Sequence, residues 1–232
     1  MHQFYIENLE KPTLSKAQKH QLKQVLRMRV GDKIRLVDLN GDGAIVEIKS
    51  DDFTSFEIIE PLQFTKQTQT LKIIASLIRN ERLEWMIQKA AETGVDEIVL
   101  YQAQHGVVKS YGNKESRKLE RFNTIALEAS EQAYRQFPLK VTQIIDQDAI
   151  KDELLVQNFY ADTHDAPSFS DEIVPNQDTC ILVGPEGGFS DKERAQFDAL
   201  SIKAVSLGER ILRAETAPMV LAVLFNDKNK KR

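Results

Sequence analysis

Two short apolar runs near the C-terminus each end at a glycine-rich turn, and this pair limits the possible folds more than any other feature. The first run leads into Gly184–Gly188, and the second leads into Leu207-Gly208. Such runs are typical of buried parallel strands, with glycine at the carboxyl end. Ser190 and Glu193 match a capping box, and Pro218 stands where a first helical turn favours proline. Ligands of open α/β sheets bind at the carboxyl ends of strands, so the two turns are candidate walls of one small-molecule site.

The residues of the first turn restrict the ligand. Gly184, Gly187 and Gly188 allow backbone groups to approach a ligand closely. The spacings of phosphate-binding and dinucleotide-binding glycine loops are both absent, and Glu186 inside the turn argues against a polyphosphate. A neutral or cationic ligand whose adenine is bound by backbone amides fits better. The alternative is a pair of ordinary strand-to-helix turns, and the residues alone leave both interpretations open.

The two motifs resemble the signature of a known family. The runs Leu182–Ser190 and Leu207–Ala217 are similar, in sequence and order, to the motifs of the RsmE-type ribosomal RNA methyltransferases of the SPOUT superfamily. The resemblance implies S-adenosylmethionine as cofactor and methylation of N3 of a uridine in 16S ribosomal RNA of the small subunit. It assigns cofactor binding to Leu182, Val183, Gly184, Pro185, Glu186, Gly187, Gly188, Leu207, Gly208, Ile211, Leu212, Arg213, Thr216 and Ala217.

Composition places the chain among globular proteins. Of 232 residues, 41% are hydrophobic and 28% are charged, which suits one large domain or two modest ones. No apolar run approaches the roughly 20 residues of a membrane span. The single cysteine, Cys180, stands in a buried-looking run and is interpreted as a core residue, so we expect a reducing, cytoplasmic setting. No metal site is predicted, because the four histidines lack ligand spacing: His2, His20, His105 and His164.

Basic residues concentrate near the N-terminus although the net charge is −4. Between Lys11 and Arg35 there are eight basic residues and one acid. Such a local excess suits contacts with RNA phosphates. The candidates for RNA binding in this stretch are Lys16, Lys19, Lys23, Arg27 and Arg29. A solvated helix face is the alternative interpretation of the same charge run.

Hydrophobic periodicity predicts two domains. A β-rich module with one early helix, residues 1–68, resembles the PUA-like β-barrel of the family, with a polar linker over 61–70. Residues 69–232 alternate strands with helices, which predicts an α/β domain with a mostly parallel sheet. The resemblance alone implies a SPOUT-type domain with a deep trefoil knot over about 155–232, and a homodimer. The expected strands are 3–6, 33–39, 44–50, 53–59, 71–77, 97–103, 141–145 and 158–162, and the expected helices are 14–28, 81–92, 114–134, 148–155 and 216–226.

Methylation at N3 requires a group that takes the imide proton and a fixed cation or amides for the negative charge on O2 and O4. Arg213 and Glu215 stand in the second motif beside the implied methyl donor. Glu131 and Arg135 are four residues apart and would share one helix face. Taken alone, that pair is a surface ion pair, but it resembles an acid-to-arginine segment of the family. All four are therefore predicted catalytic residues.

Three further residues are candidates for contact with the substrate. Arg210 is a candidate phosphate ligand, and Lys109 follows a loop that contacts RNA by resemblance. That loop departs from the family pattern at Gln104 and His105, where the family has an acid and an arginine. Trp85 is a candidate for stacking on a base, although a lone tryptophan on a helix is more often part of a core or interface.

Two rival functions stay open at this point. One is an RNA-binding or assembly factor that kept the fold and binds no cofactor. The other is a SPOUT enzyme that methylates a ribose 2′-hydroxyl or another base. For the uridine-N3 methyltransferase itself, the expected substrate is small-subunit RNA, free or within an assembled or assembling 30S particle.

Overall fold

The computed structural model describes residues 1–65, 68–163 and 166–230, which form two compact units. The first unit contains Met1–Lys66 and Ser130–Phe137, and the second contains Gln67–Ala129 and Pro138–Arg232. Residues 66 and 67, inside the expected linker, lie outside the described residues. The grouping of Ser130–Phe137 with the N-terminal residues was not predicted, because local periodicity carries no information on contacts across 130 positions.

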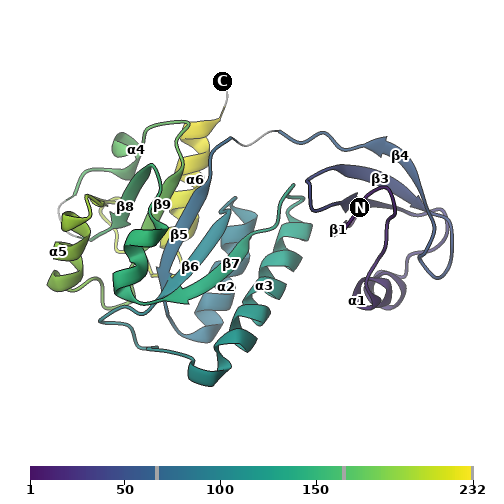
Figure 1. The fold of residues 1–232 in the computed structure, drawn as a ribbon. Helices are drawn as coiled ribbons and strands as arrows, with labels where there is room; N and C mark the ends of the chain where they lie inside the picture. Colours follow the sequence, from purple (N-terminus) through teal and green to yellow (C-terminus); the bar gives the residue numbers. More distant parts are fainter. Residues whose placement is uncertain (66–67, 164–165, 231–232) are drawn as a thin grey trace. The chain divides into compact units, whose positions relative to one another are not determined.

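The first unit is built on a four-stranded sheet in the order β1-β2-β3-β4; β1, β3 and β4 are labelled in Figure 1. Strand β1 runs parallel to β2, whereas the β2–β3 and β3–β4 pairs are antiparallel. The bounds are β1 (Gln3–Tyr5), β2 (Lys33–Val37), β3 (Gly43–Ile48) and β4 (Phe56–Pro61). Alternate side chains of β2 and β3, among them Ile34, Leu36 and Val46, are buried together with Leu22. The expected β-rich module with one early helix is confirmed.

The early helix is shorter than predicted. Helix α1 (Lys16–His20) begins at a capping box made by Ser15 and Gln18, and it continues as the π-helical turn η1 (Gln21–Val25). The chain then leaves the helix at Arg27, whose φ is +53°. With a period of 3.6 residues Val25 would share a helix face with the buried Leu22, but its side chain is 67% exposed. A π turn advances by i→i+5 bonds, so the face assigned with a period of 3.6 residues no longer applies.

The second unit contains a six-stranded sheet in the order β10-β8-β9-β5-β6-β7. Figure 1 shows β8, β9, β5, β6 and β7 side by side. Every pairing in it is parallel. The bounds are β5 (Leu71–Ser76), β6 (Glu97–Tyr101), β7 (Lys140–Ile145), β8 (Gln157–Ala161), β9 (Thr179–Val183) and β10 (Lys203–Val205). The predicted α/β class is confirmed. Strand β8 lies between β9 and β10, the two strands that feed the glycine-rich turns.

Helices cover both faces of this sheet. Along β9, Ile181 and Val183 join a core with side chains of α2, α3 and α6, whereas Cys180 and Leu182 join a second core with η3 and α5. The bounds are α2 (Asn80–Glu92), η2 (Gly112–Lys114), α3 (Glu115–Gln132), η3 (Gln147–Glu153), α4 (Phe169–Glu172), α5 (Asp191–Ala199) and α6 (Ala217–Asn229). The predicted core position of Cys180 is confirmed. In the described part of the chain, no helix is long and apolar enough to span a membrane.

Two segments differ from the prediction. The segment expected as an α-helix over 148–155 is the 3₁₀-helix η3. The connection from β7 to β8 must pass three intervening strands, and a 3₁₀-helix advances about 2.0 Å per residue against about 1.5 Å for an α-helix. The short helix α4 lies within residues 165–178, where no helix or strand was expected; residue 165 lies outside the described residues. The trefoil knot over about 155–232 stays a prediction, and residues 164–165 and 231–232 of it are not described.

Candidate active site

A cavity of about 430 Å³ lies at the carboxyl ends of β8, β9 and β10. Its walls come from three connecting segments, residues 161–163, 183–189 and 207–214, together with Arg194 of α5 and Ala217 of α6. The sheet order places β8 between β9 and β10. Because the three strands are parallel, their carboxyl ends lie at the same edge of the sheet, and the segments that follow them meet there.

The cavity brings together most of the residues predicted for the cofactor. Those that line it are Val183, Gly184, Pro185, Glu186, Gly187, Gly188, Leu207, Gly208, Ile211, Leu212, Arg213 and Ala217. Leu182 is buried in the core on the α5 side of the sheet, because neighbouring residues of a strand point to opposite faces. Thr216 lines a second cavity, described below. Sequence reasoning missed Asp162 and Thr163, since the end of β8 has no glycine or motif, and it missed Arg194 of α5, whose partner is 32 positions away.

Glycines shape two walls of this cavity. Gly188 has φ +69° and Gly208 has φ +107°, backbone conformations that L side chains rarely adopt. A Cβ atom built on either residue would meet no atom within 4 Å, so both backbones border open space. A side chain at these positions would occupy part of the cavity. Main-chain groups can therefore approach a ligand from two sides.

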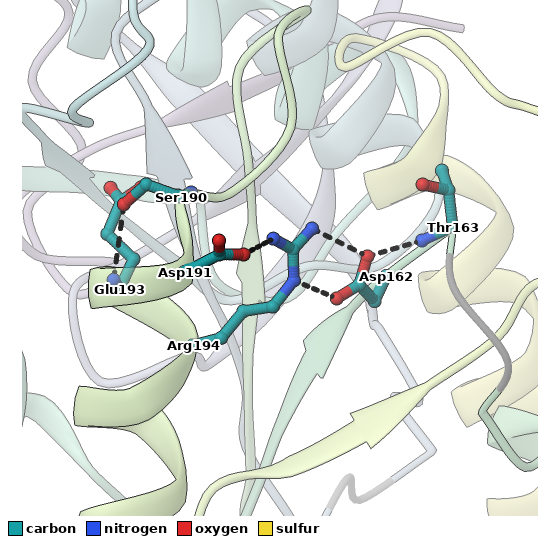
Figure 2. Close-up of polar contacts among 6 residues, drawn as sticks. All are labelled: Asp162, Thr163, Ser190, Asp191, Glu193 and Arg194. Carbon is teal, nitrogen blue, oxygen red and sulfur yellow. Dashed lines mark hydrogen bonds and ion pairs between the residues drawn. The ribbon is translucent and has the colours of Figure 1, made fainter.

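A half-buried ion pair forms the wall next to β8 (Figure 2). The Arg194 guanidinium donates to both oxygens of Asp162, with Nε–Oδ2 at 2.7 Å and Nη2–Oδ1 at 3.2 Å. Asp191 adds a third contact, from Arg194 Nη1 to Oδ1 at 3.4 Å. The hydrogen bond with Asp162 raises the pKa of Arg194. The Asp162 side chain is only 5% exposed, so its carboxylate is held in one orientation beside the cavity.

A second buried carboxylate fixes the end of the first turn. Glu193 Oε2 accepts hydrogen bonds from Ser190 N at 2.8 Å and from Ser190 Oγ at 2.9 Å, and Ser190 Oγ accepts from Glu193 N. Figure 2 shows these two residues at the beginning of α5. The predicted capping box is confirmed. The other oxygen, Oε1, accepts from Gln104 N at 3.0 Å, so Glu193 also anchors the loop that follows β6.

A second cavity of about 400 Å³ adjoins the first. It is lined by Glu81, Arg82 and Trp85 of α2 and by Arg213, Glu215 and Thr216 of the second turn. Arg213 lines both cavities. Arg82 was not singled out from the sequence, because its role depends on contacts with residues more than 100 positions away.

Ion pairs connect the two cavities. Arg82 Nη1 lies 3.0 Å from Glu186 Oε1 in the first turn, and Arg82 Nε lies 3.8 Å from Glu215 Oε1. Arg213 Nη1 lies 3.9 Å from the same Glu215 oxygen. Glu215 is buried, and its Oε2 has no hydrogen-bond partner among the described residues. A buried acceptor without a donor is costly, so this oxygen is available to a ligand.

The other predicted catalytic residues, Glu131 and Arg135, belong to the first unit and line neither cavity. Glu131 Oε1 accepts from Tyr5 N at 3.1 Å, and the Arg135 carbonyl accepts from Gln3 Nε2 and Tyr5 Oη, both at 2.7 Å. Arg135 Nε donates to the Phe137 carbonyl. These contacts hold β1 against the segment 130–137. The catalytic role of both residues stays a prediction.

The residues predicted to contact RNA lie in different settings. Lys16, Lys23, Arg27 and Arg29 are exposed and Lys19 is half-buried, and none of the five has an ion pair among the described residues. Arg210 is exposed at the first cavity. Lys109 Nζ donates to the carbonyls of Ala103 and Gln104, so it supports its own loop. Within the described ranges, which exclude His164, no cluster of His, Cys, Asp and Glu is arranged to hold a metal ion.

Comparisons with known proteins define the class. The RNA methyltransferase domain family matches residues 65–226, and the RNA methyltransferase PUA domain family matches residues 14–60. The cavity at the strand ends and the separate N-terminal sheet are thus those of an RNA methyltransferase with a PUA domain.

Individual relatives define the family. The chain is 32% identical to the ribosomal RNA small subunit methyltransferase E of Bacillus subtilis, over 86% of this chain and 83% of that protein. The Rickettsia conorii protein of the same name is also 32% identical, over 85% and 82%. A crystal structure of the Neisseria gonorrhoeae enzyme of this name, bound to S-adenosyl methionine, superposes with a TM-score of 0.88 and 26% identity, covering 98% of this chain and 97% of that one. The chain belongs to the ribosomal RNA small subunit methyltransferase E family.

Proposed function

We propose that this protein transfers the methyl group of S-adenosylmethionine to N3 of one uridine in the 16S ribosomal RNA of the small subunit. The observation that carries the proposal is the pair of adjoining cavities, one walled by glycine-rich turns and the other containing the unpaired Glu215 Oε2. Membership of the family supports the RNA substrate. The related Neisseria gonorrhoeae structure with bound S-adenosyl methionine supports the cofactor.

The first cavity fits this cofactor. Its volume of about 430 Å³ lies within the roughly 300–1,000 Å³ of small-molecule sites. The backbone around Gly188 and Gly208 borders the open space and would hold the adenosine part. Glu186 lines the cavity and supplies a carboxylate for a ligand that carries a positive charge, whereas Asp162 is held through both oxygens by Arg194. When bound, S-adenosylmethionine supplies an electrophilic methyl group, whose bond to the sulfonium sulfur breaks as a bond to N3 forms.

Residues of the second turn accept the N3 proton and stabilise the negative charge on the uracil oxygens. Glu215 Oε2, which lacks a donor, takes the proton that N3 loses, so the imide nitrogen becomes a nucleophile. Arg213 is held near Glu215 Oε1 while its side chain stays 75% exposed, and it stabilises negative charge on the uracil oxygens. Arg82 fixes Glu215 from α2. The reacting groups are then held together in attack geometry, which lowers the barrier through proximity.

The first unit would bring the RNA to this site. The exposed Lys16, Lys23, Arg27 and Arg29, with Lys19, form a basic stretch that suits phosphates. Arg210 would contact a phosphate beside the first cavity. The protein is proposed to act as a homodimer in the cytoplasm, on small-subunit RNA within an assembled or assembling 30S particle.

Three measurements test this function. Calorimetry with S-adenosylhomocysteine is expected to show binding at one site per chain; its absence would favour a binding factor that kept the fold. Mass spectrometry of nucleosides from methylated RNA is expected to yield N3-methyluridine, whereas a 2′-O-methyl product would identify the other reaction class. Primer extension across 16S RNA from cells that lack the protein should lose one stop, which locates the nucleotide.

The role of Arg213 is tested separately. Arg213→Ala is expected to slow single-turnover methylation by about 100-fold, the scale of a lost charge stabiliser. Full activity of this variant would contradict the assignment.

A further inference from the structure

We propose that the second cavity binds the target base itself and selects uracil, with Trp85 as the stacking surface and Arg82 as a specificity-determining residue. The proposal rests on the function proposed above and extends it to recognition of the substrate. Both residues project from α2 into a cavity that shares Arg213 with the first one. The reacting base would therefore lie beside the methyl donor.

Trp85 is placed to stack on a base. It is the chain's single tryptophan, and it is 40% exposed, whereas its neighbours Met86 and Ile87 on the same helix are fully buried. Glu81 and Arg82 lie one helical turn before it and line the same cavity. The exposed part of its indole lines the cavity, so part of the ring is open to a planar ligand. Stacking of a base on such a ring is worth about 1–3 kcal/mol.

The polar groups of the cavity match the edge of uracil. That edge presents an acceptor, a donor and an acceptor, namely O4, N3–H and O2. Glu215 provides an unpaired acceptor oxygen, Oε2. Arg82 and Arg213, which both form ion pairs with Glu215 Oε1, provide guanidinium donors. The cavity therefore offers one acceptor and two donors to an edge that presents one donor and two acceptors. Cytosine would place the lone pair of its N3 against the Glu215 carboxylate, so it is rejected by an unpaired polar contact.

Arg82 links base recognition to the cofactor turn. Its Nη1 contact with Glu186 at 3.0 Å joins α2 to the first turn, and its Nε contact at 3.8 Å reaches Glu215. Replacement by lysine would keep the charge but could not maintain both contacts, because an ammonium lacks the planar fork of a guanidinium. Arg82→Lys therefore separates the geometry of this contact from its charge.

The first experiment compares Trp85→Leu, Trp85→Phe and the wild-type protein on small subunits purified from cells that lack the protein. Trp85→Leu is expected to lower kcat/KM by about 5- to 100-fold, the equivalent of one stacked base, while Trp85→Phe stays within about threefold because it keeps an aromatic face. The dissociation constant for S-adenosylhomocysteine should not change in either variant. Val156→Ala is the matched control, since Val156 is an exposed apolar residue that lines neither cavity.

The same variants distinguish the alternatives. A Trp85→Leu protein that methylates within twofold of the wild type overturns the proposal. So does one whose cofactor affinity falls in parallel, because Trp85 would then support the cofactor turn, or one whose dimer dissociates in light scattering, because Trp85 would then be an interface residue between copies. Failure of the wild-type protein to bind S-adenosylhomocysteine would instead refute the proposed function.

A second experiment uses Trp85 as its own probe. Excitation at the red edge of the indole band does not excite the five tyrosines, and protein-free 16S RNA contains no tryptophan, so the emission reports on Trp85 alone. RNA with the natural uridine is expected to quench this fluorescence, and RNA with cytidine at that position is expected to bind without quenching. On small subunits reconstituted with each RNA, Arg82→Lys should reduce the difference in kcat/KM between uridine and cytidine at least fivefold. Equal quenching by both RNAs would overturn the specificity assigned to this cavity.

Discussion

Replacing Glu193 with alanine tests whether this buried carboxylate holds the first turn in place. Its side chain is fully buried and accepts three hydrogen bonds, from Ser190 N, Ser190 Oγ and Gln104 N. Alanine would leave both backbone N–H groups without a partner, at a cost of about 1–3 kcal/mol for each. Removing the buried charge relieves part of its own desolvation penalty. We therefore expect Glu193→Ala to lower the free energy of unfolding by about 2–4 kcal/mol.

Urea unfolding followed by circular dichroism measures this loss, provided that the m-value of the variant equals that of the wild type. Glu193→Gln is the matched control, because its amide keeps one acceptor oxygen and should lose about half as much stability. Calorimetry should also show weaker binding of S-adenosylhomocysteine to Glu193→Ala, since Ser190 ends the turn that lines the first cavity. A loss below about 0.5 kcal/mol, or equal losses in both variants, would refute the reasoning.

Three further predictions concern the first cavity and the core. Asp162→Asn should weaken S-adenosylhomocysteine binding in calorimetry and cost about 1–3 kcal/mol in urea unfolding, because the Arg194 guanidinium loses a charged partner; unchanged values contradict this. Gly208→Ala should cost about 1–3 kcal/mol through its φ of +107° and raise the same dissociation constant; wild-type affinity would argue against a wall at this position. Burial raises the pKa of the Cys180 thiol from about 9 to about 12, so iodoacetamide should alkylate it at pH 8 only after unfolding, as mass spectrometry would show. Since the unfolded thiol loses its proton first, this group should lower the free energy of unfolding as pH rises through that interval.

The two glycine-rich turns were predictable because each combines local signals that act over a few residues. An apolar run, a glycine and a capping pattern such as Ser190 with Glu193 all follow from short-range physics, and the structure places both turns in one cavity. The position of Leu182 away from the cavity also follows from strand alternation. This alternation was visible in the sequence, but Leu182 was predicted to bind the cofactor because the whole motif was assigned to it.

The residues that sequence reasoning missed act through long-range contacts. Arg82 reaches Glu186 across 104 positions, and Asp162 pairs with Arg194 across 32. Nothing in the periodicity of a helix or a strand specifies such partners, because they depend on the order of strands in the sheet. The placement of β8 between β9 and β10 is the fact that brings Asp162 to the cavity.

That strand order also affects how the protein acquires its pocket during synthesis. The lining residues span 161–217, and β10 adds to the edge of the sheet next to β8. A nascent chain that has emerged only as far as α5 already contains β5, β6, β7, β8 and β9, so much of its parallel sheet can form. It still lacks the turn at Leu207-Gly208. Capacity to bind the methyl donor therefore arises late in translation, after most of the hydrophobic interior is available to collapse.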